Sequence, residues 1–244
     1  MKTDRGIPIE SRWSRLGAGF YAAPAPRTPD VERLLLETVE TWSDNPRLFP
    51  MVVTWLVHYS DFVAKHRLKR LISETNDRER RAALGLLLET AMEFGASRDF
   101  RYALEVCSPL SPAVPLYEFQ RSNKVFAEIA EETASDLSKK WGLWAPEIEL
   151  KNDAIRPIGY LLEQNPTLVS RVVRKGDLRA SILESLRLDA NGEARSESEV
   201  ARLSGASRAA VGAALKALVL EGAVRVLPRE VNRRDHRVVL LPAA

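Results

Sequence analysis

Basic side chains gather near the end of this 244-residue sequence. Between residues 206 and 244 there are seven lysines and arginines against three acidic residues, an excess of four positive charges. The whole chain carries a net charge of +3, so the other 205 residues together carry −1. Guanidinium and ammonium groups bind phosphate oxygens, and their concentration on one segment is typical of a nucleic-acid contact. The charge pattern therefore favours a polyanionic partner for this segment.

Other chemistry has little support in the sequence. The single cysteine, Cys107, excludes an internal disulfide framework and a cysteine-based zinc site. Three histidines leave little material for metal catalysis, and there is no serine nucleophile elbow, phosphate-binding loop or zinc-protease motif. We therefore expect no metal, no cofactor and no enzymatic activity. The alternative is an enzyme with an unknown helical fold.

The basic side chains fall on a regular succession of predicted elements. A first helix is predicted from residue 178, and Ser196 with Glu199 forms a capping box for a short second helix. Gly205 suits a tight turn with left-handed backbone, and Ser207 then caps a third helix that ends at Gly222. Strands are predicted at 224–227 and 237–241 around a loop. The second helix carries the apolar residues Val200, Ala201 and Leu203, and the third carries Val211, Leu215 and Leu218 at i, i+4 and i+7.

This order of helix, helix, turn, helix and β-hairpin closely resembles the winged helix-turn-helix of bacterial and archaeal transcription regulators. The resemblance covers residues 177–241 and is carried mainly by the run EVARLSGASRAAV at 199–211, with ALKAL at 214–218 and EGAV at 221–224. It implies a regulator that binds duplex DNA. It also implies a homodimer, because members of this family commonly bind paired half-sites.

The resemblance also implies which residues form the core and which contact DNA. The implied core residues of the second and third helices are Val200, Ala201, Val211, Leu215 and Leu218. The third helix enters the major groove in this family and would present Ser207, Arg208, Ala209, Gly212, Ala213 and Lys216. Arg208 would reach a guanine edge, whereas the many Ala and Gly residues promise sparse direct readout of bases. The hairpin loop, or wing, would bind the DNA backbone through Arg229, Arg233, Arg234, His236 and Arg237.

The rest of the chain resembles no family that we recognise. Residues 28–175 predict an all-helical domain for dimerisation, partner binding or ligand binding, and residues 1–27 predict an irregular arm that packs through Trp13, Phe20 and Tyr21. The first helix of the domain is expected to begin at Thr28–Pro29, and one long amphipathic helix is expected over 119–141. The fold class is therefore mainly α, with a small C-terminal hairpin.

Two alternatives concern partners. Lys65, Arg67, Lys69 and Arg70 form a second basic cluster, which fits either a solvated helix face or an auxiliary contact to DNA or protein. Winged helices also serve as protein-docking modules, so a scaffold or complex subunit is the alternative to a DNA-binding regulator. No apolar run is long enough to cross a membrane, and we expect a cytoplasmic protein.

Overall fold

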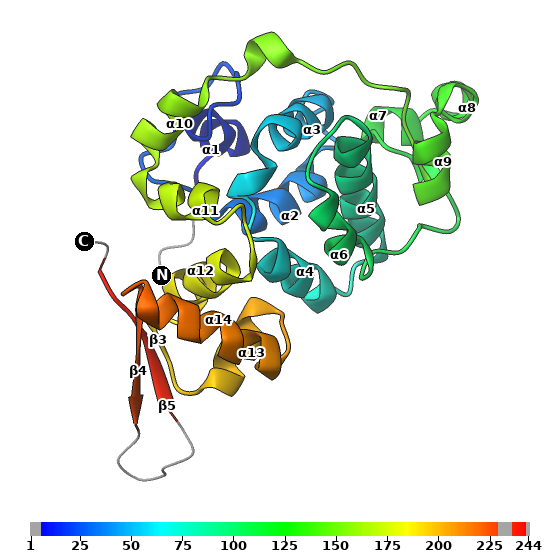
Figure 1. Cartoon of the computed structure of the whole chain (residues 1–244). Coiled ribbons are helices and arrows are strands. Elements are labelled where there is room, and N and C mark those ends of the chain that lie inside the picture. Colours follow the sequence, from blue (N-terminus) through cyan, green and yellow to red (C-terminus); the bar gives the residue numbers. More distant parts are fainter. Residues whose placement is uncertain (1–5, 229–235, 243–244) are drawn as a thin grey trace.

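The computed structural model describes residues 6–228 and 236–242 and is mainly helical, with a small antiparallel sheet near the C-terminus (Figure 1). This confirms the predicted fold class. The α-helices before residue 177 are α1 (Ile9–Arg15), α2 (Val31–Thr41), α3 (Leu48–Tyr59), α4 (Lys65–Glu74), α5 (Arg78–Glu93), α6 (Arg101–Leu104), α7 (Glu118–Arg121), α8 (Lys124–Thr133), α9 (Asp136–Trp141), α10 (Ile158–Gln164) and α11 (Val169–Val173). Two short strands, β1 (Val114–Pro115) and β2 (Leu143–Trp144), pair in parallel.

The C-terminal part, residues 177–242, holds α12 (Leu178–Asp189), β3 (Glu193–Ala194), α13 (Glu197–Ser204), α14 (Arg208–Leu220), β4 (Val224–Pro228) and β5 (His236–Leu240). The helices and the hairpin follow the predicted order. The sheet order is β3-β5-β4, with both pairings antiparallel. The sequence analysis did not predict β3, because a two-residue strand has no periodicity of its own.

Buried apolar side chains form two separate clusters. The larger cluster lies before residue 177 and includes Trp13, Trp42 and Trp55, and the smaller one lies within the C-terminal part. The five residues that the sequence predicted as its core are all buried: Val200, Ala201, Val211, Leu215 and Leu218. The helical periodicity of this segment therefore identified the inward faces correctly.

The two parts meet through buried charges, which lie at the junction of α2, α4, α11 and α12. The fully buried guanidinium of Arg67 binds the carboxylates of Asp30, Glu32 and Asp189 at 2.7, 2.7 and 2.9 Å. Beside it, Arg171 binds Glu32 at 2.6 Å and Glu184 at 2.7 Å. We call these six residues the junction network. Two of the residues of the predicted basic cluster on α4, Lys65 and Arg67, are thus buried, and neither a solvated face nor a DNA contact describes them.

The N-terminal arm differs from its prediction. Residues 9–15 form α1, and the fully buried Trp13 donates its Nε1 hydrogen bond to Thr38 Oγ1 at 2.9 Å. Tyr21, expected to pack on the body, is instead 98% exposed. Phe20 is half-buried against the larger apolar cluster, so Trp13 and Phe20 pack on the body as predicted and Tyr21 does not.

Two helix boundaries were also predicted wrongly. Helix α2 begins after Asp30, whose carboxylate accepts a hydrogen bond from the Arg33 amide, and not at Thr28–Pro29. The expected long helix over 119–141 is three helices, because Asn123 and Ser135 cap α8 and α9 with their side chains. Such short polar side chains compete for backbone groups and start new helices.

Candidate nucleic-acid interface

Helices α13 and α14 form a helix–turn–helix unit in geometry. Their axes are bent by 104° across a turn of three residues, Gly205 to Ser207, and angles of about 90–120° are typical of such units. Gly205 has a φ of +73°, and a Cβ atom there would lie 2.5 Å from the carbonyl oxygen of His66. Glycine is required both by its backbone angle and by the closeness of α4.

The N-terminus of each helix is capped by a serine. Ser196 Oγ accepts the amide hydrogen of Glu199 at 3.2 Å, and Ser207 Oγ accepts that of Ala210 at 3.3 Å. The Glu199 carboxylate accepts from the Arg195 amide at 2.7 Å instead of from Ser196, so the predicted capping box is closed one residue earlier. The cap engages the acceptor side of Ser207 and leaves its hydroxyl hydrogen available to donate.

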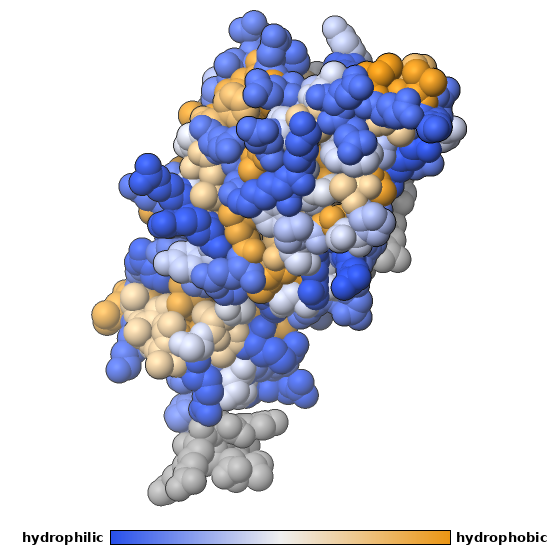
Figure 2. Space-filling view, turned by 90° about the vertical axis from the view of Figure 1, so that its right-hand side faces the viewer, coloured by the Kyte–Doolittle hydropathy of each residue, from blue (hydrophilic) through white to orange (hydrophobic). Residues whose placement is uncertain are grey.

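The outward face of α14 carries the predicted site residues. Ser207, Arg208, Ala209, Ala213 and Lys216 are exposed, whereas Gly212 is half-buried. The remaining outward positions are mostly apolar, and Leu220 at the end of the helix is 89% exposed. Figure 2 shows this face at lower left as a weakly hydrophobic surface. Hydrogen-bonding groups on the helix are therefore few, as its alanine content predicts.

Ion pairs refine the charge pattern of the C-terminal part. Arg237, predicted to bind DNA, lies 2.9 Å from the carboxylate of Glu193 on the neighbouring strand, so its charge is compensated. The carboxylate of Glu221 is bound by Arg174 and, at 2.8 Å, by Arg179. These two arginines lower the pKa of Glu221, with the hydrogen bond from Arg174 as the largest cause. Within the described residues, Arg208, Lys216 and Arg225 form no ion pair.

His236 and Arg237, both predicted to contact DNA, lie on opposite faces of the hairpin. Pro228 pairs with His236 and Leu227 with Arg237 in the β4–β5 register. Successive side chains of a strand point to opposite faces, so His236 and Arg237 lie on different faces of the sheet. His236 is half-buried on the face that also holds the buried Val238. The other three wing residues, Arg229, Arg233 and Arg234, lie outside the described residues.

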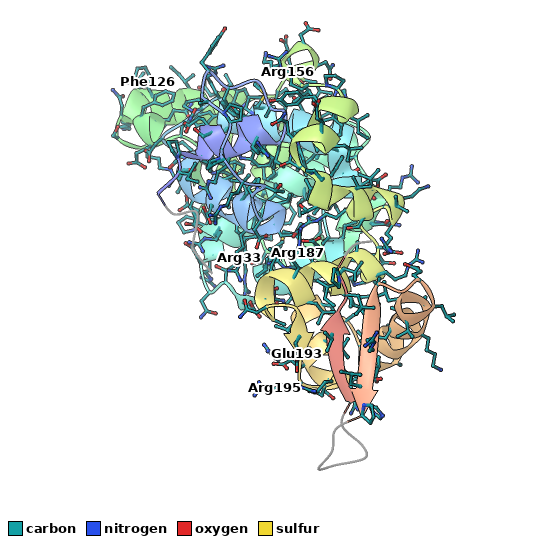
Figure 3. All side chains as sticks on the ribbon, turned by 90° about the vertical axis from the view of Figure 1, so that its left-hand side faces the viewer. Arg33, Phe126, Arg156, Arg187, Glu193 and Arg195 are labelled. Carbon is teal, nitrogen blue, oxygen red and sulfur yellow. The ribbon has the colours of Figure 1, made fainter. Side chains whose placement is uncertain are left out.

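Two arginines, one just before α13 and one within it, are cations that the sequence analysis did not select. Arg195 and Arg202 have side chains that are 78% and 63% exposed, and both contact the carboxylate of Glu199. The hydrogen bond from Arg195 is the largest cause that lowers the pKa of Glu199. Figure 3 shows Arg195 and Glu193 beside the sheet, at the end of the molecule that holds the hairpin. The sequence feature that could have identified these arginines is their position, since Arg195 directly precedes the capping residue Ser196 and Arg202 follows Glu199 by three residues.

The other chemistry-bearing residues do not converge. Within the described ranges, no three His, Cys, Asp or Glu side chains are arranged to hold a metal ion. His58 bonds to Asn152 at 2.8 Å, and His66 stacks on Tyr102. Burial raises the pKa of the Cys107 thiol to about 12, so this thiol stays protonated at neutral pH.

Comparisons with known proteins add no relative. No family model, curated protein or solved structure matches the chain. Among the described helices, none is by itself long and apolar enough to span a membrane, and α13 with α14 reaches that composition only as the bent pair described above.

Proposed function

We propose that this protein binds duplex DNA through its C-terminal part and acts as a transcription regulator of the winged helix-turn-helix kind. The observation that carries the proposal is the outward face of α14. It bears Arg208 and Lys216 on a helix held at 104° to α13, with the positive side chain of Arg225 on the adjacent hairpin. A helix in this arrangement fits the major groove while the hairpin lies along the backbone.

The accounting of ion pairs supports the same partner. Glu221, at the C-terminal end of α14, is paired with Arg174 and Arg179, which precede the helix–turn–helix unit. Its negative charge therefore does not oppose Arg208 and Lys216. Phosphate groups would then meet Arg208 and Lys216 on the helix and Arg225 on the strand, none of which forms an ion pair with a described residue. Cytoplasmic location and regulation of transcription follow from this proposal as expectations.

A second function is favoured by one observation. The α14 face ends in the exposed apolar side chains of Val219 and Leu220, 42% and 89% exposed, which suit a protein surface better than a phosphate backbone. The alternative is therefore a scaffold or complex subunit that docks another protein on α14.

The test measures binding of a fluorescent duplex by anisotropy over a series of salt concentrations. Replacing both Arg208 and Lys216 with alanine should weaken binding and reduce the salt slope by about 1.8 if each contacts one phosphate. The matched control replaces Arg98 and Lys139, two exposed cations of the N-terminal part, with alanine. It removes the same charge and should leave the slope unchanged.

Three results would decide against the proposal. Absence of duplex binding at low salt would remove DNA as the partner and favour the scaffold. An equal loss in the test and control variants would show that binding follows total charge rather than the α14 face. Binding that is unaffected by the test variant would move the contact elsewhere.

A further inference from the structure

Helix α8 has its apolar side in solvent. Of its ten residues only Ala130 is buried, and Val125, Phe126 and Ile129 are 60%, 47% and 47% exposed. Phe119 of α7, itself 53% exposed, lies edge-on to Phe126 with ring centroids 6.3 Å apart. We call these four residues the α8 patch. Figure 2 shows it as the strongly hydrophobic area at upper right.

The helix lacks the packing that normally stabilises such an element. Isolated helices shorter than about 12–15 residues are marginal in water, and most helices of folded proteins are stabilised by burying an apolar face. The apolar face of α8 instead points away from the body of the protein. Contiguous exposed apolar surface of this kind marks an interaction site.

The charges on α8 indicate what covers the patch. A helix favours acidic groups near its N-terminus and basic groups near its C-terminus, because its dipole is positive at the first end and negative at the second. Helix α8 has the reverse pattern: Lys124 is its first residue, and Glu131 and Glu132 lie in its last turn. Each end therefore carries a charge that its own helix disfavours.

We propose that the α8 patch binds the α8 patch of a second copy of this chain, with the two α8 helices antiparallel about a two-fold axis. In that arrangement the positive N-terminal end of each helix, with Lys124, lies beside the partner's negative C-terminal end, with Glu131 and Glu132. The same pairing buries the phenylalanines of both copies. Glu128, near the middle of the helix, lies 3.8 Å from the ammonium of Lys124 in its own chain.

A uniformly charged partner fits these observations less well. Lys124 stands at the N-terminal end of α8, where Glu128 contacts it, and Glu131 and Glu132 stand at the C-terminal end. A wholly acidic segment would therefore meet like charges at the C-terminal end, and a wholly basic segment would meet the positive N-terminal end of the helix. An isologous contact satisfies both ends with one surface.

The position of the patch determines the shape of the dimer. Figure 3 shows Phe126 at one end of the molecule and the hairpin, beside Glu193 and Arg195, at the other. Two copies joined at α8 therefore keep their C-terminal parts free of the interface and remote from it. Only the following consequence rests on the proposed function: such a dimer would hold two separate duplex segments, whereas the sequence analysis expected one dimer on adjacent half-sites.

The dimer is tested by the mass of the full chain in solution, measured by light scattering across a wide range of concentrations. The wild type should reach twice the chain mass of 27.3 kDa. Phe126→Glu places a charge in the patch and should give a monomer with unchanged circular dichroism. Tyr21→Glu is the matched control, since Tyr21 is an aromatic residue 98% exposed outside the patch, and it should leave the dimer intact.

The antiparallel arrangement has its own test. Lys124→Glu and Glu132→Lys should each weaken the dimer by bringing like charges together, and the double swap should restore it. A second measurement uses an immobilised duplex and a labelled free duplex. The wild type should retain the free duplex, whereas Phe126→Glu should bind one duplex and retain none of the other.

The outcomes separate the two proposals. A wild type that stays monomeric at all concentrations, or a dimer that survives Phe126→Glu, would overturn the α8 dimer. A double swap no stronger than the single swaps would overturn the antiparallel pairing. A stable dimer that binds no DNA would overturn the proposed function alone, and a dimer that binds DNA without joining two duplexes would overturn the consequence for DNA.

Discussion

At the scale of single residues, the outward face of α14 depends on very few side chains. Arg208 and Lys216 are its two cations, and the residues between them are Ala, Gly and buried apolar side chains. The residue types predicted the exposure of every residue of this face except Gly212, and the serine cap of α14, because capping and helical periodicity are local properties. The pairing of Arg237 with Glu193 and of Glu221 with Arg174 and Arg179 was not predictable, because these partners are 42 to 47 residues apart in the chain.

The first prediction concerns Arg208. If its guanidinium reads a guanine edge, Arg208→Ala should cost about 1–3 kcal/mol on a site selected from random DNA and much less on unselected duplex. Binding of both duplexes would be measured at one salt concentration. An equal loss on both would show that Arg208 contacts phosphate and reads no base.

The second prediction concerns the wing residues Arg233 and Arg234, which lie outside the described residues. Their replacement by alanine should weaken binding to duplexes of every sequence. It should also lower the salt slope by about 1.8, because fewer counterions leave the DNA on binding when two phosphate contacts are lost. Titrations at several salt concentrations measure the slope. The variant Arg98→Ala/Lys139→Ala serves again as the charge-matched control, and a slope like the wild type's in the wing variant would contradict a wing contact.

At the scale of elements, the sequence predicted that helices exist more reliably than where they end. Residues 119–141 show a continuous helical pattern, yet Asn123 and Ser135 divide them, because their side chains accept amide hydrogens of the residues that follow. The turn before α14 was predicted well, since Gly205 leaves a plain signal in the sequence. Its contact with α4 was not predicted, because it joins segments about 140 residues apart.

The third prediction concerns that turn. Gly205→Ala should lower the free energy of unfolding by at least roughly 1–2 kcal/mol, the usual cost of a left-handed backbone for an L-residue. The new Cβ would also meet the His66 carbonyl oxygen at 2.5 Å and push α13 away from α4. Thermal unfolding measures the effect. Gly212→Ala in α14, where a Cβ meets nothing within 4 Å, is the control and should be neutral or stabilising.

At the scale of the whole molecule, the junction network makes the C-terminal part continuous with the rest. Its members come from four helices spread over more than 150 residues, so no sequence pattern revealed them. The end of the predicted helical domain at residue 175 falls between the two apolar clusters. Buried ion pairs nevertheless join the parts that carry these clusters. Removing one partner of a buried ion pair typically lowers the free energy of unfolding by about 3–5 kcal/mol. The junction network therefore holds the C-terminal part, and α14 with it, in a fixed orientation.

The fourth prediction is the pH dependence of this junction. Burial alone would raise the pKa values of Asp30, Glu184 and Asp189, but the arginines bound to them outweigh it and lower all three. A carboxylate whose pKa is lower in the folded state binds protons more weakly there than in the unfolded chain. Its stabilising effect is therefore complete at pH values above the pKa values of the unfolded chain, 3.8 for aspartate and 4.5 for glutamate. The effect is lost as the pH falls through the lower pKa values of the folded state.

Denaturant unfolding followed between neutral pH and about pH 2 tests this directly, since carboxylate titration dominates acid unfolding in that range. The wild type should keep a constant free energy of unfolding from neutral pH to near the unfolded carboxyl pKa values and then lose it steeply. Glu184→Gln should be less stable at neutral pH, because Arg171 loses a buried charged partner, and its acid loss should be shallower. A Glu184→Gln curve parallel to that of the wild type would show that this carboxylate is not a source of the acid sensitivity.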